Sequence, residues 1–181
     1  MFYENERFAL FIDGPNFFST ARALNLDVDY KRLLEFFQAK GRMVRANYFT
    51  PLADTEDHVS IRPLVDWMQY NGWNVMTKPA KVYEDEDGRK RTKGSTDMEM
   101  AVEVMRLAPA IEHAVIVSGN RDFAPVVKFL QERGARVTLI SSIRTHPPMI
   151  SDDLRRQVDA FVDLDALRND IAREAKASAA A

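Results

Sequence analysis

The chain has 181 residues, 46% of them hydrophobic and 29% charged, and a formal net charge of -2; these values are typical of one soluble globular domain and argue against a protein coated in nucleic acid. It contains no cysteine and three histidines, which excludes disulfides, thiolate zinc sites and cysteine nucleophiles and disfavours a histidine-rich metal site. Any metal ion must then be held mainly by oxygen, which favours magnesium or manganese. No run approaches the roughly 20 apolar residues of a membrane helix, and the first residues lack a signal-peptide pattern, so we expect a cytoplasmic protein with no membrane partner.

Short apolar runs alternate with amphipathic helical patterns along the whole chain. The runs end at polar turns, which is typical of buried parallel strands. We expect six of them, over residues 7–12, 43–49, 73–77, 115–117, 137–140 and 161–164. A short helix near Asn16 and a polar C-terminal helix flank longer helices at about 30–39, 59–70, 96–107, 123–133 and 152–158.

Two local patterns refine this outline. Residues 82–91 contain Asp87-Gly88, a strong tight-turn signal, and predict a small hairpin. The helix at 96–107 carries an apolar stripe that we expect to face the core, made of Met98, Ala101, Val102, Met105 and Leu107. Together the patterns predict a single α/β domain with a Rossmann-like parallel sheet and helices on both faces.

Three aspartates lie where strands end or helices begin. Asp13 follows the first apolar run, Asp97 opens the helix at 96–107, and Asp122 follows the fourth run. Ligands of open α/β sheets bind outside the carboxyl ends of the strands, so these side chains can converge on one edge. Clustered carboxylates hold hard divalent cations, which indicates a metal-dependent phosphoryl-transfer protein.

Each motif also has a purely structural interpretation. Asp13, Gly14, Pro15 and Asn16 are all turn-forming residue types, and Asn16 could cap the following helix. Asp97 is favoured by the dipole of the helix that it opens, and residue 122 could be an N-cap. The order of all three motifs along an α/β chain is more specific than any one of them.

A basic stretch precedes Asp97. It consists of Lys78, Lys81, Arg89, Lys90, Arg91 and Lys93. Such a charge run is often only a solvated loop. Its position beside the acidic motifs leads us to expect that Lys93 and Arg91, with Ser118 and Arg121 of the last motif, contact nucleic-acid phosphates.

The three motifs in this order resemble those of a known family. They read Ile12-Asp13-Gly14-Pro15-Asn16, Lys93-Gly94-Ser95-Thr96-Asp97 and Ser118-Gly119-Asn120-Arg121-Asp122-Phe123. The resemblance is to the NYN domain of the PIN-like nuclease superfamily, closest to the LabA-like branch. It covers a core of about residues 8–167 within a single domain expected to span 1–181.

The resemblance implies a ribonuclease that depends on Mg²⁺ or Mn²⁺ and acts on RNA, for which we expect a single strand. It implies that Asp13, Asp97 and Asp122 are catalytic metal ligands and that Asn16 is a polar catalytic neighbour. A homo-oligomer is compatible with these patterns.

One position departs from the family. The last motif usually reads Ser-Gly-Asp-x-Asp-Phe, and Asn120 stands at the first aspartate. An amide can offer a carbonyl oxygen to a cation but carries no charge, so Asn120 should bind metal more weakly than a carboxylate. Two functions therefore remain open: an active ribonuclease, or a catalytically weakened or silent regulator that binds RNA or nucleotides. A metal-dependent phosphatase is less favoured, because no second aspartate follows Asp13 two residues on.

Overall fold

Seven strands form one sheet in the computed structural model, which describes residues 2–53, 61–84 and 90–174, with the side chains of residues 53, 81–84 and 90–93 outside that description. The strands are β1 (Arg7–Asp13), β2 (Arg42–Ala53), β3 (Trp73–Glu84), β4 (Lys90–Lys93), β5 (His113–Val117), β6 (Arg136–Ser141) and β7 (Ala160–Asp163). The helices are α1 (Gly14–Ala23), α2 (Tyr30–Gln38), α3 (Arg62–Tyr70), α4 (Asp97–Leu107), α5 (Ala124–Glu132), α6 (Asp152–Gln157) and α7 (Arg168–Ile171). Three short 3-10 helices are η1 (Ala108–Ala110), η2 (Arg121–Phe123) and η3 (Leu164–Leu167).

The strand order is β4-β3-β2-β1-β5-β6-β7, and every pair is parallel except β3 with β4. Without β4, this is the 3-2-1-4-5-6 order of a Rossmann sheet, which confirms the predicted fold class. The order reverses at β1, which pairs with β2 on one side and β5 on the other. Ligand sites of such sheets lie at the carboxyl ends of these two strands.

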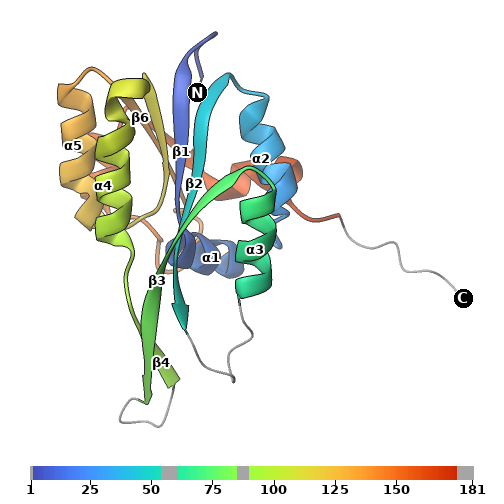
Figure 1. Cartoon of the computed structure of the whole chain (residues 1–181). Coiled ribbons are helices and arrows are strands. Elements are labelled where there is room, and N and C mark those ends of the chain that lie inside the picture. The colour runs from blue at the N-terminus through green and yellow to red at the C-terminus, as the bar shows by residue number, and fades with distance from the viewer. Residues whose placement is uncertain (1, 54–60, 85–89, 175–181) are drawn as a thin grey trace, which may run out of the picture.

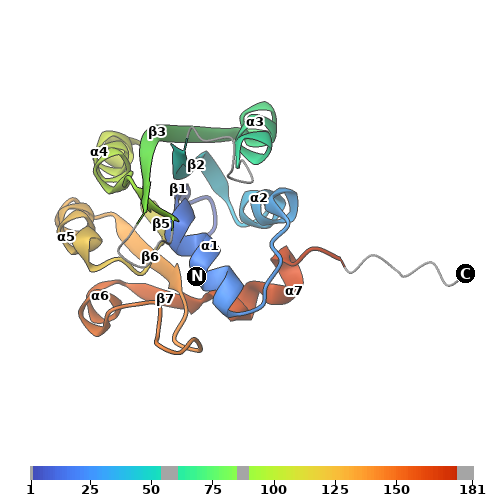
Figure 2. The same cartoon turned by 90° about the horizontal axis from the view of Figure 1, so that it is seen from below.

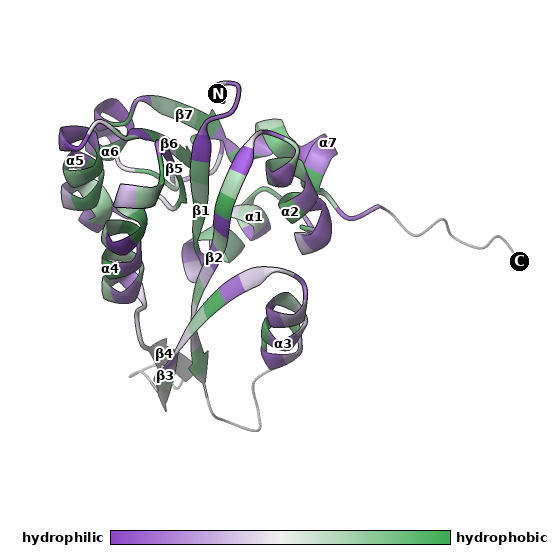
Figure 3. Ribbon diagram, turned by 45° about the horizontal axis from the view of Figure 1, so that its top comes forward, coloured by the Kyte–Doolittle hydropathy of each residue, from purple (hydrophilic) through white to green (hydrophobic). Residues whose placement is uncertain are grey.

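Helices cover both faces of the sheet (Figures 1 and 2). Alternate side chains of β1 point to opposite faces: Phe8 and Leu10 pack with α1, α2, α3 and α7, and Ala9 and Phe11 pack with α4, α5 and α6. Each fully buried large apolar side chain contributes roughly 1.5–3 kcal/mol, so the two clusters hold the sheet between its helices. The helices are two-coloured in Figure 3, as expected of amphipathic helices on a sheet.

The third strand is longer than the sequence predicts. It continues past residue 77 to Glu84 and pairs with β4 from Lys81 opposite Lys93 onward. The predicted hairpin is therefore present, while its turn at 85–89 lies outside the described residues. The extension places β4 immediately before Gly94 and the start of α4.

The predicted inward stripe of α4 is wrong for three of its five residues. Met98, Val102 and Met105 are 71%, 57% and 45% exposed, and Ala101 is only partly buried. The buried apolar residues are Met100, Val104 and Leu107, of which only the last belonged to the predicted stripe. The apolar residues of α4 spread over a wide arc of the helix, so the sequence pattern alone does not determine which part of that arc is buried.

No helix in the described part of the chain has both the length and the apolar character needed to cross a membrane.

Candidate active site at the carboxyl edge of the sheet

Asp13 ends β1 and caps α1, so its side chain lies at the point where the strand order reverses. Its Oδ1 accepts a hydrogen bond from the backbone N–H of Asn16 at 3.3 Å, and its Oδ2 accepts one from the Ser118 hydroxyl at 2.7 Å. The residue is 7% exposed. Two hydrogen bonds and burial therefore fix this carboxylate in one orientation.

Burial raises the pKa of Asp13 above its usual value. The hydrogen bonds from Ser118 and Asn16 oppose this rise, and the nearby charge of Asp97 adds to it. Desolvation is the largest cause, so the environment disfavours the ionised form mainly by excluding water. A cation bound beside this carboxylate would reverse the balance.

Gly14 allows the chain to turn closely over β2 directly after Asp13. A Cβ at this position would lie 2.6 Å from the carbonyl oxygen of Phe49 and 2.8 Å from Cζ of Tyr48. Only glycine permits this approach. The glycine of the first motif thus sets where α1 leaves the strand.

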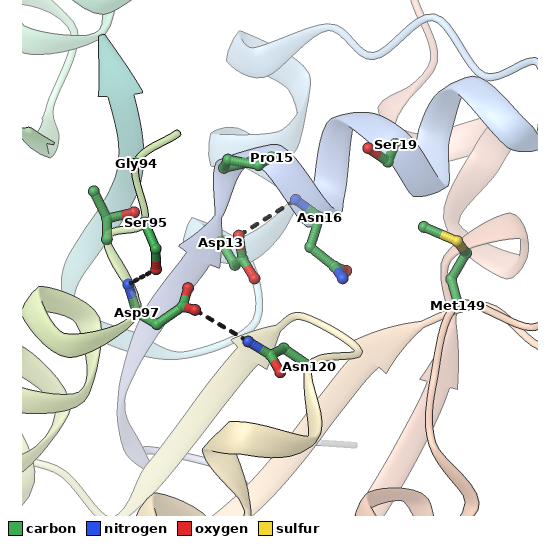
Figure 4. A pocket seen from close by; sticks show the side chains of 10 residues that line it. Asp13, Pro15, Asn16, Ser19, Gly94, Ser95, Asp97, Asn120 and Met149 are labelled. Atoms are coloured by element: carbon green, nitrogen blue, oxygen red, sulfur yellow. Dashed lines mark hydrogen bonds between the residues drawn. The ribbon is translucent and has the colours of Figure 1, made fainter. Parts of the chain in front are cut away.

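Asp97 reaches the same edge from the first turn of α4. Its backbone N–H donates to the Ser95 hydroxyl at 3.1 Å, which fixes the start of the helix. Its Oδ2 accepts a hydrogen bond from the side-chain amide of Asn120 at 3.2 Å. Figure 4 shows the side chains of Asp13, Asp97 and Asn120 turned toward one another.

Asn120 presents its nitrogen, and not its oxygen, to Asp97. Its Oδ1 accepts the backbone N–H of Asp122 at 3.0 Å and caps η2. The reverse amide orientation would put two acceptors together at Asp97 and two donors together at residue 122. The hydrogen bonds therefore determine the orientation, and the amide neutralises part of the field of Asp97.

Asn16 connects the first and last motifs. Its Oδ1 accepts the backbone N–H of Gly119 at 3.0 Å. A Cβ at Gly119 would overlap the carbonyl oxygen of Met149, so this glycine lets the loop before α6 close against β5. Met149 consequently forms a wall of the site that the sequence motifs do not indicate (Figure 4).

These side chains enclose an open cavity of about 450 Å³. Its lining residues are Asp13, Pro15, Asn16, Ser19, Gly94, Ser95, Thr96, Asp97, Asn120 and Met149. Three predicted metal ligands, Asp13, Asp97 and Asn120, and the predicted neighbour Asn16 are thus brought together. These residues are far apart in the sequence, and the parallel sheet brings them to the same edge.

The other predicted site residues lie elsewhere or serve other contacts. Asp122 is exposed on η2 and is not among the lining residues. Ser118 is buried behind Asp13, and Arg121 pairs with Asp153 at 3.2 Å. Arg91 and Lys93 belong to β4, whose side chains are outside the described part.

Comparison with known proteins gives this geometry a family. The NYN domain model matches residues 7–165. The chain belongs to the NYN domain family. It is 27% identical over 173 residues to the low amplitude and bright protein LabA of Synechococcus elongatus, covering 93% of this chain and 89% of that protein. The match places it in the LabA-like branch of the PIN-like nucleases, a family that generally uses divalent metals and is associated with RNA.

A solved structure supports the fold alone. The crystal structure of a protein of unknown function from Vibrio parahaemolyticus aligns with a TM-score of 0.70 and 23% identity. The alignment covers 93% of this chain and 97% of that chain. The two molecules therefore share one fold over nearly all of their length.

The donor set of this NYN domain fits a loosely held magnesium-type ion but not a protein-made cage. Within the described residues there is no group of three or more His, Cys, Asp or Glu side chains that could hold a metal. Asp13 and Asp97 are two carboxylates on one cavity. Mg²⁺ is commonly bound by one or two carboxylates together with waters and substrate phosphates. The site therefore fits an ion that shares its coordination with a phosphate.

The sequence did not predict the role of Ser118 in orienting Asp13, nor the presence of Met149 at the site. Ser118 was expected to contact nucleic acid, yet its hydroxyl also accepts the backbone N–H of Asn120 at 3.1 Å while donating to Asp13. Its place directly after a buried strand was the available signal. Met149 lies in a loop without periodicity, so no sequence signal points to it.

Proposed function

We propose that this NYN domain is a ribonuclease that hydrolyses RNA phosphodiester bonds with the help of Mg²⁺ or Mn²⁺. The observation that carries the proposal is the buried carboxylate of Asp13 facing Asp97 across one cavity at the point where the strand order reverses. A cavity of this volume falls within the range of small-ligand sites, and a single nucleotide phosphate can enter it. The PIN-like nuclease family supports the same reaction class.

In this proposal Asp13 and Asp97 would hold one divalent ion beside the bound phosphate. The bound ion would lower the pKa of a water molecule and neutralise charge on the scissile phosphate. Ser118 and the Asn16 backbone keep Asp13 oriented toward the ion. This orientation needs no reorganisation when substrate binds, which is how preorganised groups lower a barrier.

Further groups of the cavity suit a phosphate. The N-terminus of α1 opens onto it, and helix N-termini favour anions. The Asn16 amide nitrogen has no hydrogen-bond partner in the described part of the chain and can donate to a phosphate oxygen. Lys93 and Arg91 would bind flanking phosphates from the β4 hairpin.

Asn120 supports a second candidate, a catalytically weakened or silent protein that binds RNA or nucleotides. Its amide nitrogen lies where a third carboxylate is expected and already satisfies Asp97. A cation must compete with that hydrogen bond, so its affinity is lower than in a three-carboxylate site. Under this alternative the cavity binds the phosphate group but does not turn it over.

A cleavage assay separates the two candidates. Single-stranded RNA would be incubated with Mn²⁺ or Mg²⁺ and the purified wild type, Asn120→Asp or Asp13→Asn, with chelator in parallel. The ribonuclease proposal expects cleavage by the wild type, an increase of about tenfold or more in Asn120→Asp, and none in Asp13→Asn or with chelator, because each carboxylate adds charge that binds the ion. The exposed Asp152→Asn is the control that keeps wild-type activity.

Each result decides between the candidates. Cleavage only after Asn120→Asp identifies the natural chain as the silent binder. Cleavage that survives Asp13→Asn contradicts the proposed site. We extend the proposal to one domain over residues 1–181, while a cytoplasmic location stays a prediction.

A further inference from the structure

A second, larger cavity lies against α1. Its volume is about 840 Å³, within the range of small-molecule sites. Its lining comes from α1, the segment after it, α2, β2 and α3: Phe18, Ala21, Arg22, Asn25, Leu26, Asp27, Val28, Tyr30, Tyr48, Ile61, Leu64 and Arg173. It shares no residue with the acidic cavity, whose α1 residues are Pro15, Asn16 and Ser19.

Three aromatic side chains line this cavity. Tyr30 and Tyr48 meet edge to face with ring centroids 5.7 Å apart, and Phe18 lies 59% exposed at its rim. Rings in this arrangement can stack on a planar ligand.

Two tyrosine hydroxyls leave a hydrogen bond unmade inside this cavity. The hydroxyls of Tyr30 and Tyr48 are 3.4 Å apart, and neither has another partner in the described part of the chain. Burial raises the pKa of both phenols, so each keeps its proton. One proton fills the shared hydrogen bond, and the other has no acceptor. That proton, on whichever phenol accepts the shared hydrogen bond, is available to a ligand in the cavity.

The charge of the lining is positive. Arg173 lies 3.8 Å from Asp27, and this pair is roughly neutral. Arg22 is exposed on the last turn of α1 and makes no ion pair with any described residue. A single available guanidinium at the rim of an aromatic cavity favours a ligand with one anionic group.

We propose that this cavity is a second binding site, independent of metal, that takes a nucleoside monophosphate unit. Phe18 stacks on the base, the remaining tyrosine hydroxyl proton is donated to an acceptor on the base edge, and Arg22 pairs with the phosphate. The unit is either a free mononucleotide or one nucleotide of an RNA strand. The inference does not rest on the ribonuclease proposal, since the cavity shares no residue with the acidic site.

The test measures binding of adenosine and uridine monophosphates to the whole chain by titration calorimetry, with chelator present to remove metal-dependent binding at the acidic cavity. The wild type should bind at least one of the two. Phe18→Ala and Arg22→Gln should each weaken binding by about tenfold, the size expected for one stacked base or one charged contact. Tyr30→Phe keeps the ring and should weaken binding about fivefold by removing one hydroxyl.

Matched controls locate the ligand. Tyr70→Ala removes an aromatic ring that is 90% exposed on α3 and does not line the cavity, so binding should be unchanged. Asp13→Asn should also bind normally. Binding lost in Asp13→Asn but kept in Phe18→Ala would put the nucleotide in the acidic cavity and overturn the inference, as would no binding of either nucleotide.

A single-stranded RNA oligonucleotide distinguishes the two sources of the ligand. If its binding in chelator is tighter than that of the mononucleotides and also falls in Phe18→Ala, the cavity serves a strand. If the oligonucleotide does not depend on Phe18 while the mononucleotides do, the cavity serves free nucleotides. The chelator also prevents metal-dependent cleavage of the oligonucleotide during the titration. The binding result therefore does not depend on whether the chain proves to be a ribonuclease.

Discussion

Asp13 and Asn120 respond in opposite ways to the absence of a cation. The buried carboxylate of Asp13 is disfavoured in its ionised form, because water is excluded and Asp97 lies near. The amide of Asn120 instead donates a hydrogen bond to Asp97. The asparagine therefore favours the metal-free molecule at the position where a carboxylate would favour the metal-bound one.

Another buried polar residue lies at the amino ends of the parallel strands, away from the acidic cavity. His113 is fully buried in β5, with Nδ1 3.0 Å from Oε2 of Glu6 and Nε2 2.7 Å from the Thr138 hydroxyl. A carboxylate can only accept, so Nδ1 carries the proton and Nε2 accepts from Thr138. Arg136 pairs with the same carboxylate at 3.0 Å. The neutral imidazole is thus satisfied on both sides.

This histidine predicts a pH dependence of stability. Burial lowers its pKa below 6.5, and the Glu6 carboxylate only partly opposes this effect. The unfolded chain takes up a proton near pH 6.5 while the folded one does not, so stability is present above that pH and is lost as pH falls from about 6.5 toward the lowered pKa. Urea midpoints between pH 5.5 and 7.5 should therefore fall on acidification.

His113→Gln should lower the midpoint at every pH and flatten its pH dependence. The cost at neutral pH should be about 1–3 kcal/mol, the usual size for a buried hydrogen-bonded group that loses a partner. His146→Gln, at an exposed loop position, is the matched control and should keep the wild-type curve. An unchanged slope in His113→Gln would show that another group sets the pH dependence.

At the scale of the element, α4 shows that packing determines which side of a helix is buried when two of its sides carry apolar residues. Two stripes, one through Met98 and Val102 and one through Met100 and Val104, both have helical spacing. The second packs in the cluster beneath β1 and β5. Glu103 lies on the buried side and is paired with Arg106 through two hydrogen bonds of 2.7 and 2.6 Å. A buried glutamate on the packed face is opposite to what a hydrophobic pattern predicts.

Two valines of this helix provide a matched pair of variants. Val104→Ala removes fully buried methyl groups and should lower the free energy of unfolding by about 1–3 kcal/mol. Val102→Ala, at 57% exposure, should change it by less than about 0.5 kcal/mol. Denaturant unfolding measures both. Equal losses of unfolding free energy in the two variants would contradict the observed orientation of α4, in which Val104 is buried and Val102 is exposed.

The sequence predicts elements best where a strand ends at a polar turn. The apolar run before Asp13 and the one before Ser118 are both β-strands in the structure. Asp97 opens α4, within one residue of the predicted start of that helix. The face of α4 and the contact of Gly119 with Met149 could not be predicted, because they depend on packing between segments far apart in the chain. Single-sequence patterns report periodicity and turns but not which surfaces meet.

At the scale of the whole molecule, alternating strands and helices lead to the observed sheet order, since parallel strands joined by right-handed crossovers leave few alternatives. This order brings Asp13, Asp97 and Asn120 onto one cavity. The orientation of the Asn120 amide could not be predicted from the sequence, because it depends on a hydrogen bond from the backbone of η2. The lining of the second cavity comes from segments far apart in the chain, and no local pattern encodes how they meet.

Metal binding should be visible as stabilisation of the whole fold. A ligand that binds only the folded state stabilises it by about 2.7 kcal/mol at a concentration of 100 times its Kd, and for a chain of this size each kcal/mol shifts Tm by about 2–4 °C. The wild type has two carboxylates for the ion and should shift by a few degrees in millimolar Mn²⁺ or Mg²⁺. Asn120→Asp should start at a lower Tm without metal, because the new carboxylate lies against Asp97, and should shift more when metal is added.

Scanning calorimetry with and without chelator measures these shifts. Asp13→Asn should abolish the shift, since it removes one of the two carboxylates that line the cavity among the described residues. The exposed Asp152→Asn on α6 should shift as the wild type does, which separates site binding from a general effect of divalent ions on surface charge. Equal shifts in the wild type, Asn120→Asp and Asp13→Asn would mean that the ion does not bind at this edge of the sheet. In that case the cavity would hold phosphate through α1 and the Asn16 amide alone.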